Sequence, residues 1–164
     1  MRYIILFVVL IVILGCGEKA EEKAAEKIME KVIASNIGDK ATVDIEGENI
    51  QIKTKDGTMR ITSGESAELP SGFPKDIFLY DNADLNSSMA LPEGYTLSFQ
   101  TKDDPLKVSE TYLKEMAANG WSKEMSMDMG EQKMLGFQKE QRVVNVIISP
   151  DEDATRIGLT VQKE

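Results

Sequence analysis

Hydrophobic and polar residues alternate in several short stretches of the chain, a pattern typical of strands that bury one face. Three such stretches, residues 42–46, 49–55 and 58–62, follow one another closely. Asp56-Gly57 separates the last two, and this dipeptide favours a two-residue hairpin turn. The pattern predicts a small three-stranded meander with one apolar face.

A helical period precedes this meander, over residues 18–36. Its apolar residues form a stripe at the spacing of an α-helix: Ala25, Ile28, Met29, Val32 and Ile33. Lysine and glutamate each recur every four residues between residues 18 and 31. Either the lysines contact anionic lipid headgroups, or the stripe packs on the strands and the charges are solvated. We favour the second interpretation, because the glutamates cancel the attraction to lipid.

The rest of the chain combines further strands with one helix. Alternating stretches predict strands at residues 85–90, 95–101, 121–129, 133–139, 142–149 and 156–162. Asp104-Pro105 supplies the N-cap and the first residue of a helix, which Gly120 ends. The order predicts an α+β fold, an antiparallel sheet with one covering helix (ββαββββ), preceded by a helix plus a three-stranded meander.

The first residues of the chain have a different character. An unbroken apolar run of about twelve residues follows Met1-Arg2, and a helix of that length measures roughly 18 Å. Because a bilayer span needs ~20 residues, the run fits the hydrophobic part of a secretory signal that is removed from the mature protein.

This apolar run ends in Ile13-Leu14-Gly15-Cys16, which resembles the lipobox of bacterial lipoproteins. The resemblance implies that the lipoprotein signal peptidase recognises Ile13, Leu14 and Gly15, cleaves before Cys16 and leaves the Cys16 thiol acylated. Acyl chains hold such a protein at a membrane that it does not span. Gly17 replaces the aspartate of the inner-membrane retention signal. The resemblance therefore implies the periplasmic face of the outer membrane in a Gram-negative cell, or the outer face of the cytoplasmic membrane in a Gram-positive cell.

Composition divides the mature chain near residue 68, because all five prolines lie beyond it. Ser63-Gly64-Glu65-Ser66 is interpreted as a linker just before that point. We expect a cleaved signal peptide over residues 1–15. A lipidated cysteine, an amphipathic helix and the small meander occupy residues 16–66, and the α+β sheet domain occupies residues 67–164.

A second resemblance covers about residues 68–164. The Pro-rich run over residues 69–77, the strand at 95–101 and the helix end at Asn119-Gly120-Trp121 resemble a domain of uncharacterised bacterial lipoproteins and secreted proteins. The resemblance implies the fold of this region and brings no catalytic residues with it. Phe73, inside the Pro-rich run, is expected to pin that run to the domain.

The charge balance and the residue types exclude several function classes. With 28 acidic against 19 basic residues, nucleic acid is not an expected partner, since phosphate contacts need clusters of Lys and Arg. The chain has no histidine, which removes Ser-His-Asp and Cys-His catalysis and the commonest zinc ligand. Ser-x-x-Lys, Gly-x-Ser-x-Gly and Gly-rich phosphate loops are absent. We therefore expect no catalytic residues.

Two residue patterns remain as candidates for metal chemistry. Carboxylates cluster at residues 81–84, 103–104 and 151–153. Helix capping explains residues 103–104, and neither residues 151–153 nor residues 44–48 follow the spacing of a calcium loop. Met125, Met127 and Met129 occupy alternate positions and share one face of the expected strand. Thioether sulfur suits Cu(I), but the row also reads as the core face of a strand that continues from Trp121 under the preceding helix. We favour the interpretation as a core face, and we therefore expect no cofactor apart from the covalent lipid on Cys16.

These observations lead to one functional hypothesis and two alternatives. The chain is expected to be a membrane-anchored envelope lipoprotein, a non-enzymatic binding or assembly module for an envelope protein or a cell-wall partner. The first alternative is an exported Cu(I)-binding lipoprotein that uses the row of three methionines. The second alternative is an uncharacterised hydrolase, for which the sequence supplies no motif.

Overall fold

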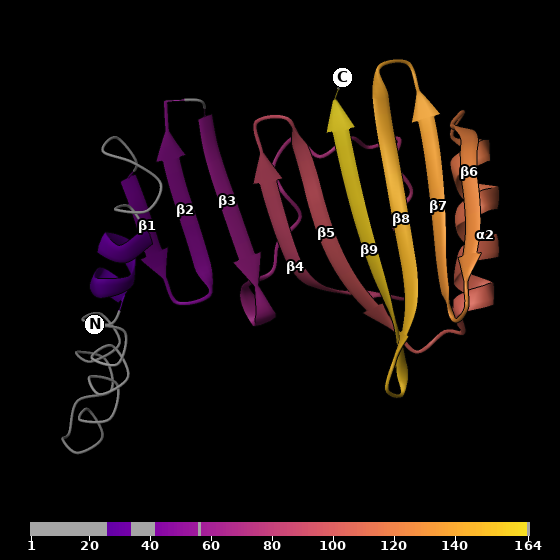
Figure 1. The fold of residues 1–164 in the computed structure, drawn as a ribbon, viewed down its shortest axis with the longest axis horizontal. Coiled ribbons are helices and arrows are strands. Elements are labelled where there is room, and N and C mark those ends of the chain that lie inside the picture. Colours follow the sequence, from indigo (N-terminus) through magenta and orange to yellow (C-terminus); the bar gives the residue numbers. More distant parts are fainter. Residues whose placement is uncertain (1–25, 34–41, 56, 164) are drawn as a thin grey trace, which may run out of the picture.

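The computed structural model describes residues 26–33, 42–55 and 57–163. Within these residues the strands form one antiparallel sheet, so the predicted α+β fold is confirmed (Figure 1). An N-terminal helix over residues 26–33 comes first. The elements that follow are β1 (Thr42–Glu46), β2 (Asn49–Thr54), β3 (Gly57–Ser63), the 3-10 helix η2 (Gly64–Ser66), β4 (Asp84–Leu91), β5 (Gly94–Thr101), α2 (Pro105–Ala118), β6 (Ser122–Met129), β7 (Gln132–Lys139), β8 (Arg142–Asp151) and β9 (Ala154–Lys163). The signal region, Cys16 and the ends of the helix predicted over residues 18–36 lie outside the described residues.

Two meanders meet in the middle of the sheet. The strand order is β1-β2-β3-β4-β5-β9-β8-β7-β6. The chain runs from β1 to β5, crosses through α2 to the far edge at β6, and returns until β9 pairs with β5 from Gly94↔Gln162 to Thr101↔Thr155. β3 pairs with β4 from Arg60↔Ala90 to Ser63↔Ser87, so strands on both sides of the expected linker belong to the same sheet.

The helix α2 begins and ends at the residues that its capping signals predict. The Asp104 carboxylate accepts a hydrogen bond from the Leu106 amide at 2.8 Å, and Pro105 is the first helical residue. At the other end Gly120 has a φ of +81°. This left-handed conformation lets the amide of Trp121 donate to the Met116 carbonyl at 3.0 Å and closes the last turn.

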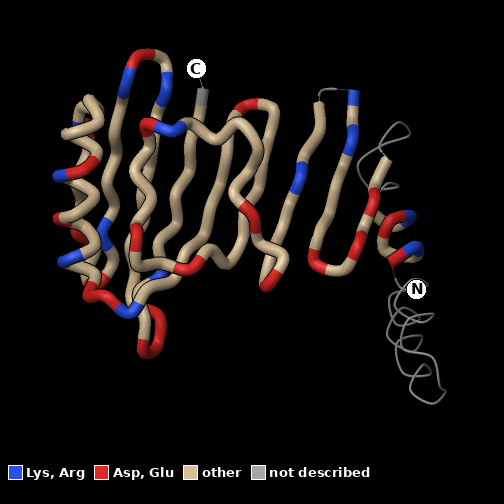
Figure 2. The backbone as a smooth tube through the Cα atoms, turned by 180° about the vertical axis from the view of Figure 1, so that it is seen from behind, with Lys and Arg blue, Asp and Glu red and all other residues tan. Residues whose placement is uncertain are grey.

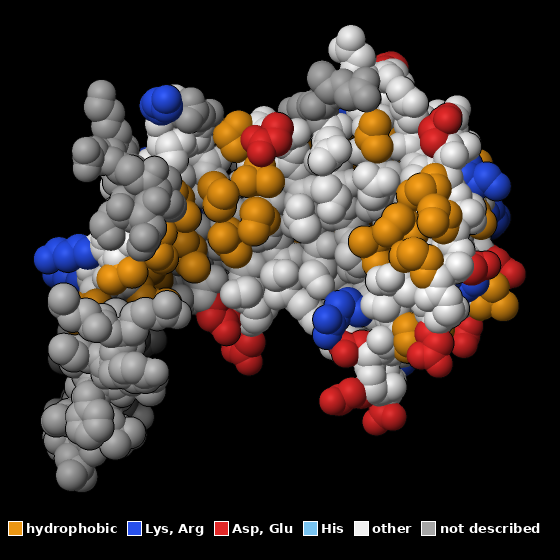
Figure 3. All heavy atoms as spheres, in the orientation of Figure 1, with side chains coloured by type: hydrophobic (Ala, Val, Ile, Leu, Met, Phe, Trp, Pro, Cys, Tyr) orange, Lys and Arg blue, Asp and Glu red, His pale blue; other side chains and the backbone are white. Residues whose placement is uncertain are grey.

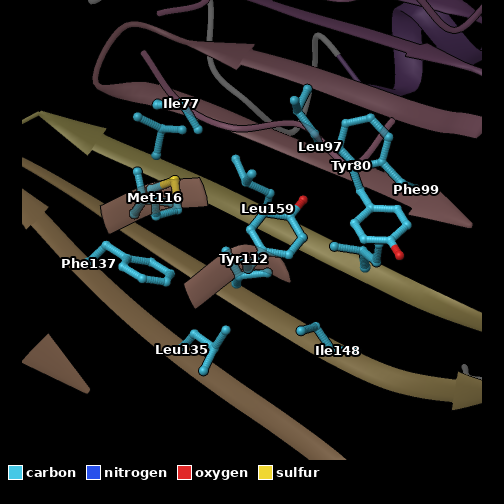
Figure 4. Close-up of a cluster of buried hydrophobic side chains, with 14 of the residues drawn as sticks. Ile77, Tyr80, Leu97, Phe99, Tyr112, Met116, Leu135, Phe137, Ile148 and Leu159 are labelled. Carbon is cyan, nitrogen blue, oxygen red and sulfur yellow. The ribbon is translucent and has the colours of Figure 1, made fainter. Parts of the chain in front are cut away.

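A large core lies between the sheet and a layer made of α2 and the segment 64–83 (Figures 2 and 4). We call this side of the sheet the helix-covered face and the other side the open face. The helix contributes Val108, Tyr112 and Met116, which are fully buried. The sheet contributes Leu97, Phe99, Leu135, Phe137, Val144, Val146, Ile148, Ile157, Leu159 and Val161.

The segment 64–83 is fixed to the sheet by its aromatic side chains. Phe73 is buried and meets Tyr95 edge to face, with ring centroids 5.4 Å apart, as expected for a residue that pins this segment. Tyr80 stacks on Tyr112 of the helix, and its hydroxyl donates to the Asp103 carboxylate at 2.8 Å. The helix and the segment therefore form one continuous cover.

The apolar residues at the β1 end point to the opposite side of the sheet. Directly paired residues share a face. One such row crosses the sheet through Ile61, Met89, Thr96, Thr160 and Asn145. Asn145 lies between Val144 and Val146, which are buried under α2, so the whole row belongs to the open face. A small core of Val43, Ile45 and Ile52 lies on the same face as Ile61 and is partly covered by Ile33.

The N-terminal helix lies beside the outer edge of β1 (Figure 1) and satisfies part of its backbone. The amide of Gly47 donates to the Glu26 carboxylate at 2.9 Å, and the amide of Ile45 donates to the Glu30 carboxylate at 3.1 Å. An i, i+4 step on the helix covers about 6 Å and a two-residue step on a strand about 6.8 Å, so the two spacings match. The glutamate row of the sequence thus supplies acceptors to an edge strand.

The predicted packing of the helix stripe on the strands is wrong for most of the stripe. Ile28, Met29 and Val32 are 64%, 58% and 55% exposed, and Ile33 alone among the described residues of the stripe packs against the small core, Ala25 lying outside them. The glutamates occupy the side of the helix that faces β1, which turns these three residues outward. Within the described residues, no helix combines the length and apolar character that a membrane crossing requires.

Candidate functional site

The edge strand β6 carries the methionine row, and the structure places it on the open face. Met127 and Met129 are each 45% exposed, and Met125 is half-buried. Ser126 pairs with Leu135, which is buried under α2, so the residues on either side of Ser126 point away from the helix. The prediction that this row belongs to the core is therefore wrong.

A β-bulge explains why the methionine row lies on the open face although alternation from Trp121 predicts the core. Trp121 is buried in the large core, and Lys123 pairs with Phe137 on the helix-covered face. The register then shifts between Lys123 and Met125. Such a bulge inserts one unpaired residue and reverses the phase of every later side chain. The row that would have continued from Trp121 into the core therefore emerges on the open face.

Neighbouring strands extend the row into an apolar patch, which we call the methionine surface. It consists of Met125, Met127, Met129, Met134 and Ile147. Met127 pairs directly with Met134, which pairs with Ile147, so the patch spans β6, β7 and β8 (Figure 3). Met125 lies opposite Gly136, where a Cβ would approach the Met125 Cβ to 3.1 Å. The glycine thus leaves room for Met125 against the sheet.

The polarity of the open face changes sharply beside the methionine surface. Moving toward the centre of the sheet, the same face carries Asn145, Gly158, Thr160, Ser98 and Thr96. Small polar residues such as these leave the middle of the face flat, and Figure 3 shows it without hydrophobic side chains. The methionine surface is therefore a bounded patch at one end of the sheet.

A groove of about 590 Å³ brings together three carboxylate clusters that lie apart in the sequence. Its lining includes Asp84, Asp103 and the turn at residues 151–153. Asp151 pairs with Arg156 at 2.7 Å and Asp103 with Lys107 at 2.8 Å. Among the described residues, no three His, Cys, Asp or Glu side chains converge closely enough to hold a metal ion. The groove therefore gathers negative charge without forming a chelating site.

A second groove, of about 720 Å³, runs on the helix-covered face between β2–β4 and the segment 64–71. Its floor is polar, with Arg60 as the one cation among the lining residues. Thr62 and Ser88 lie 3.0 Å apart at the base, and both hydrogen-bond to the backbone of Glu68. Because these hydroxyl groups already bind the segment above them, they hold the two layers together.

Asp76 forms a third cluster, which locks the segment 64–83 to the β7–β8 hairpin. Its carboxylate accepts two hydrogen bonds from Arg142 and one from Lys139, all at 2.8 Å. The Asp76 carbonyl accepts from the Trp121 indole at 2.8 Å, and the Arg142 guanidinium lies 5.0 Å from the centre of the Trp121 ring. Residues of the Pro-rich run and of the helix end thus meet in a structural latch.

The electrostatics of these clusters do not resemble those of an acid-base catalyst. Arg142 and Lys139 hold the pKa of the Asp76 carboxyl well below its usual value. Lys107 and the Tyr80 hydroxyl likewise lower the pKa of Asp103. A general acid needs a carboxyl pKa that is raised toward neutrality. The pKa values of Asp76 and Asp103 are shifted in the opposite direction.

Fold and surface together define an α+β protein whose antiparallel sheet has one face covered by a helix and the other open, with apolar side chains at both ends of the open face (Figure 3). Residues 82–155 match the family model described as START domain-like. The matched stretch runs from β4 through α2 to the start of β9, covers less than half of the chain, and lies within the region 68–164 for which a family relationship was expected. No curated protein and no solved structure matches the chain.

Proposed function

We propose that this chain is a bacterial envelope lipoprotein, anchored through an acylated Cys16, that acts as a non-enzymatic binding module for an envelope protein. The lipobox at residues 13–16 supports the anchor. The methionine surface supports the binding role, and its exposure is the observation that carries the proposal. In this reading the protein works at the periplasmic face of an outer membrane or at the outer face of a cytoplasmic membrane.

The chemistry of the methionine surface favours a protein partner over a cell-wall glycan. Thioether side chains are flexible and polarizable, and they adapt to the apolar side chains of a partner. Contiguous exposed apolar patches on a domain of this size mark interaction surfaces. A glycan presents hydroxyl groups that need hydrogen-bond partners, and the five side chains of this patch are all apolar.

Site-specific photocrosslinking in the native cells tests the binding role. A photoreactive phenylalanine analogue replaces Met127 in one strain and Leu106 in another. Leu106 is the matched control, because it is apolar and 53% exposed but lies on α2. We expect a discrete adduct with an envelope protein from position 127 and none from position 106. The adduct should disappear when Met129→Lys and Met134→Lys are added, since charge opposes burial of the patch.

Two results contradict the binding role. One is equal crosslinking from positions 127 and 106, and the other is an adduct at 127 that the added lysines do not change. The anchor has its own test, because Cys16→Ser removes the acylated sulfur. A Cys16→Ser chain that is still processed before residue 16 and held at the membrane would contradict acylation.

Cu(I) binding is the second candidate, favoured by the direct pairing of Met127 with Met134. Directly paired residues have Cβ atoms about 5 Å apart, which brings two soft sulfur ligands together on an accessible surface. Replacing Met125, Met127 and Met129 by Leu separates the candidates. Leu keeps the volume and the apolar surface but removes the thioethers. Loss of Cu(I) binding by this variant, in competition with a chromophoric chelator, would identify the thioethers as copper ligands, whereas an unchanged Cu(I) affinity would exclude copper.

A further inference from the structure

The N-terminal helix divides its surface between the sheet and the outside. Successive residues of an α-helix are rotated by about 100°. Glu26 and Glu30 therefore lie on the side of the helix that accepts hydrogen bonds from β1, and Ile28 points roughly the opposite way. Lys31 and Lys27 lie about 60° and about 100° around the helix from Ile28, at the flank of the outward side, and both are exposed.

The structure turns the two described glutamates of this helix away from its outward side. Equal numbers of lysine and glutamate along the sequence suggest that attraction to an anionic surface cancels. In the fold the two described glutamates are hydrogen-bonded to the backbone of Ile45 and Gly47. The outward side therefore combines two lysines with three apolar side chains, each more than half exposed. Apolar residues flanked by lysine are typical of helices that lie in a membrane interface.

We propose that the outward side of residues 26–33 lies in the headgroup region of an anionic phospholipid bilayer, with Ile28 and Met29 inserted and Lys27 and Lys31 near the phosphates. This rests on the proposed anchor at Cys16. Residue 26 follows Cys16 by ten positions, and a fully extended chain of that length reaches at most about 35 Å. The helix is thus held close to the bilayer that receives the acyl chains.

This contact sets the orientation of the whole sheet. β1 lies next to the helix, and β6 lies at the other end of the sheet (Figure 1). Neighbouring strands are about 4.8 Å apart, so eight spacings separate the two edges by about 40 Å. With β1 at the membrane, the methionine surface is presented far from the bilayer, where a partner protein can reach it.

Spin-label accessibility on vesicles tests the contact. Cys16 is the sole cysteine of the chain, and acylation blocks its thiol, so Ile28→Cys and Leu106→Cys each introduce one labelling site. The acylated full-length chain is bound to vesicles of phosphatidylethanolamine and phosphatidylglycerol. Lipid-soluble oxygen and a water-soluble nickel complex then compete to relax the label. We expect the ratio of oxygen to nickel accessibility to be at least about fivefold higher at position 28 than at position 106, because the label at 28 lies in lipid.

The same samples distinguish the failure of each proposal. If the chain sediments with vesicles but both labels show the same nickel accessibility, the anchor stands and the interfacial helix is wrong. If position 28 is shielded in native membranes but open to nickel on pure lipid, a protein covers the helix and the lipid proposal is again wrong. If the processed chain carries no acyl mass and leaves the vesicles, both proposals fail.

Lipid charge gives a second readout on the same helix. Lys27→Glu with Lys31→Glu should lower the oxygen-to-nickel ratio at position 28 on vesicles that contain phosphatidylglycerol. Lys107→Glu with Lys114→Glu, on α2, is the matched control and should leave the ratio unchanged. An equal effect of both pairs would contradict a local contact between this helix and the headgroups.

Discussion

The two ends of the sheet solve the problem of an edge strand differently. At β1, glutamates of the N-terminal helix accept hydrogen bonds from the outward amides, and the core behind the strand contains three buried residues. At β6, the described residues leave the outer edge open, while α2 and a far larger core support the strand from behind. An edge strand can thus be protected by side chains that bind its outward backbone groups, or it can be left open while a large core holds it in place. Among the described residues, only the second arrangement leaves the outer backbone of an edge strand uncovered.

The largest expected difference between the two ends is in the free energy of unfolding that their cores contribute. Phe137→Ala removes a buried ring beneath α2, and we expect a loss of about 3 to 5 kcal/mol in the free energy of unfolding. Ile52→Ala, in the small core, should cost about 2 kcal/mol, because fewer neighbours surround the cavity. Urea denaturation measures both values. A larger loss for Ile52→Ala would show that the β1 end carries the stability.

The Asp76 cluster, which binds the β7–β8 hairpin, gives a pH-dependent test of the β6 end of the sheet. Asp76→Asn should cost roughly 1 to 2 kcal/mol at pH 6, allowing for partial solvent exposure of the carboxylate. Arg142 and Lys139 lower the folded-state pKa of Asp76, so the unfolded chain takes up a proton first, near its usual value of about 3.9. The stabilisation is complete above about pH 5 and declines as the pH falls below 4. Unfolding measured at pH 6 and pH 3 should therefore show a narrower gap between wild type and variant at pH 3. Parallel pH dependences would contradict this role.

The smallest effect is expected at the protected edge. Glu30→Ala removes the acceptor for the Ile45 amide and should cost about 0.5 to 1.5 kcal/mol, felt locally at β1. Hydrogen exchange should become faster at Ile45 and its neighbours and stay unchanged in β8. Lys31→Ala is the matched control on the outward side of the same helix. Equal exchange in the two variants would mean that the glutamate does not protect the edge.

Local signals predicted most of the fold because each of them acts over a few residues. The order of strands and the limits of α2 follow from alternation, from the Asp104-Pro105 cap and from Gly120. The hairpin between β2 and β3 is confirmed, but its turn was predicted one residue too late, because Gly57 already belongs to β3 and pairs with Thr54; Asp56 lies outside the described residues. The expected packing of Phe73 against the domain is also confirmed. It was predictable because an aromatic residue in an extended, Pro-rich segment has few other partners.

The candidate site was predicted in its residues but not in its place. The three methionines share one face, as their spacing requires, yet a single bulge between Lys123 and Met125 decides which face that is. Alternation is equally consistent with either side of a sheet. Met134 lies across the Gly130 turn, as the hairpin signal predicts, but Ile147 comes from β8, and nothing in the linear spacing of β6 connects it to the row.

The local elements can be derived from the sequence, because hydrophobic period, caps and turn residues act through the nearest backbone. Which side of each element is covered depends on contacts between segments that are distant in the chain. The apolar residues of β1 and β2 face the open side, the buried apolar residues of β7, β8 and β9 lie on the helix-covered face, and the glutamates of the N-terminal helix face an edge strand. A side chain is buried or exposed according to what the rest of the chain brings to it, and that is settled by the register of strands and by the cover of one helix.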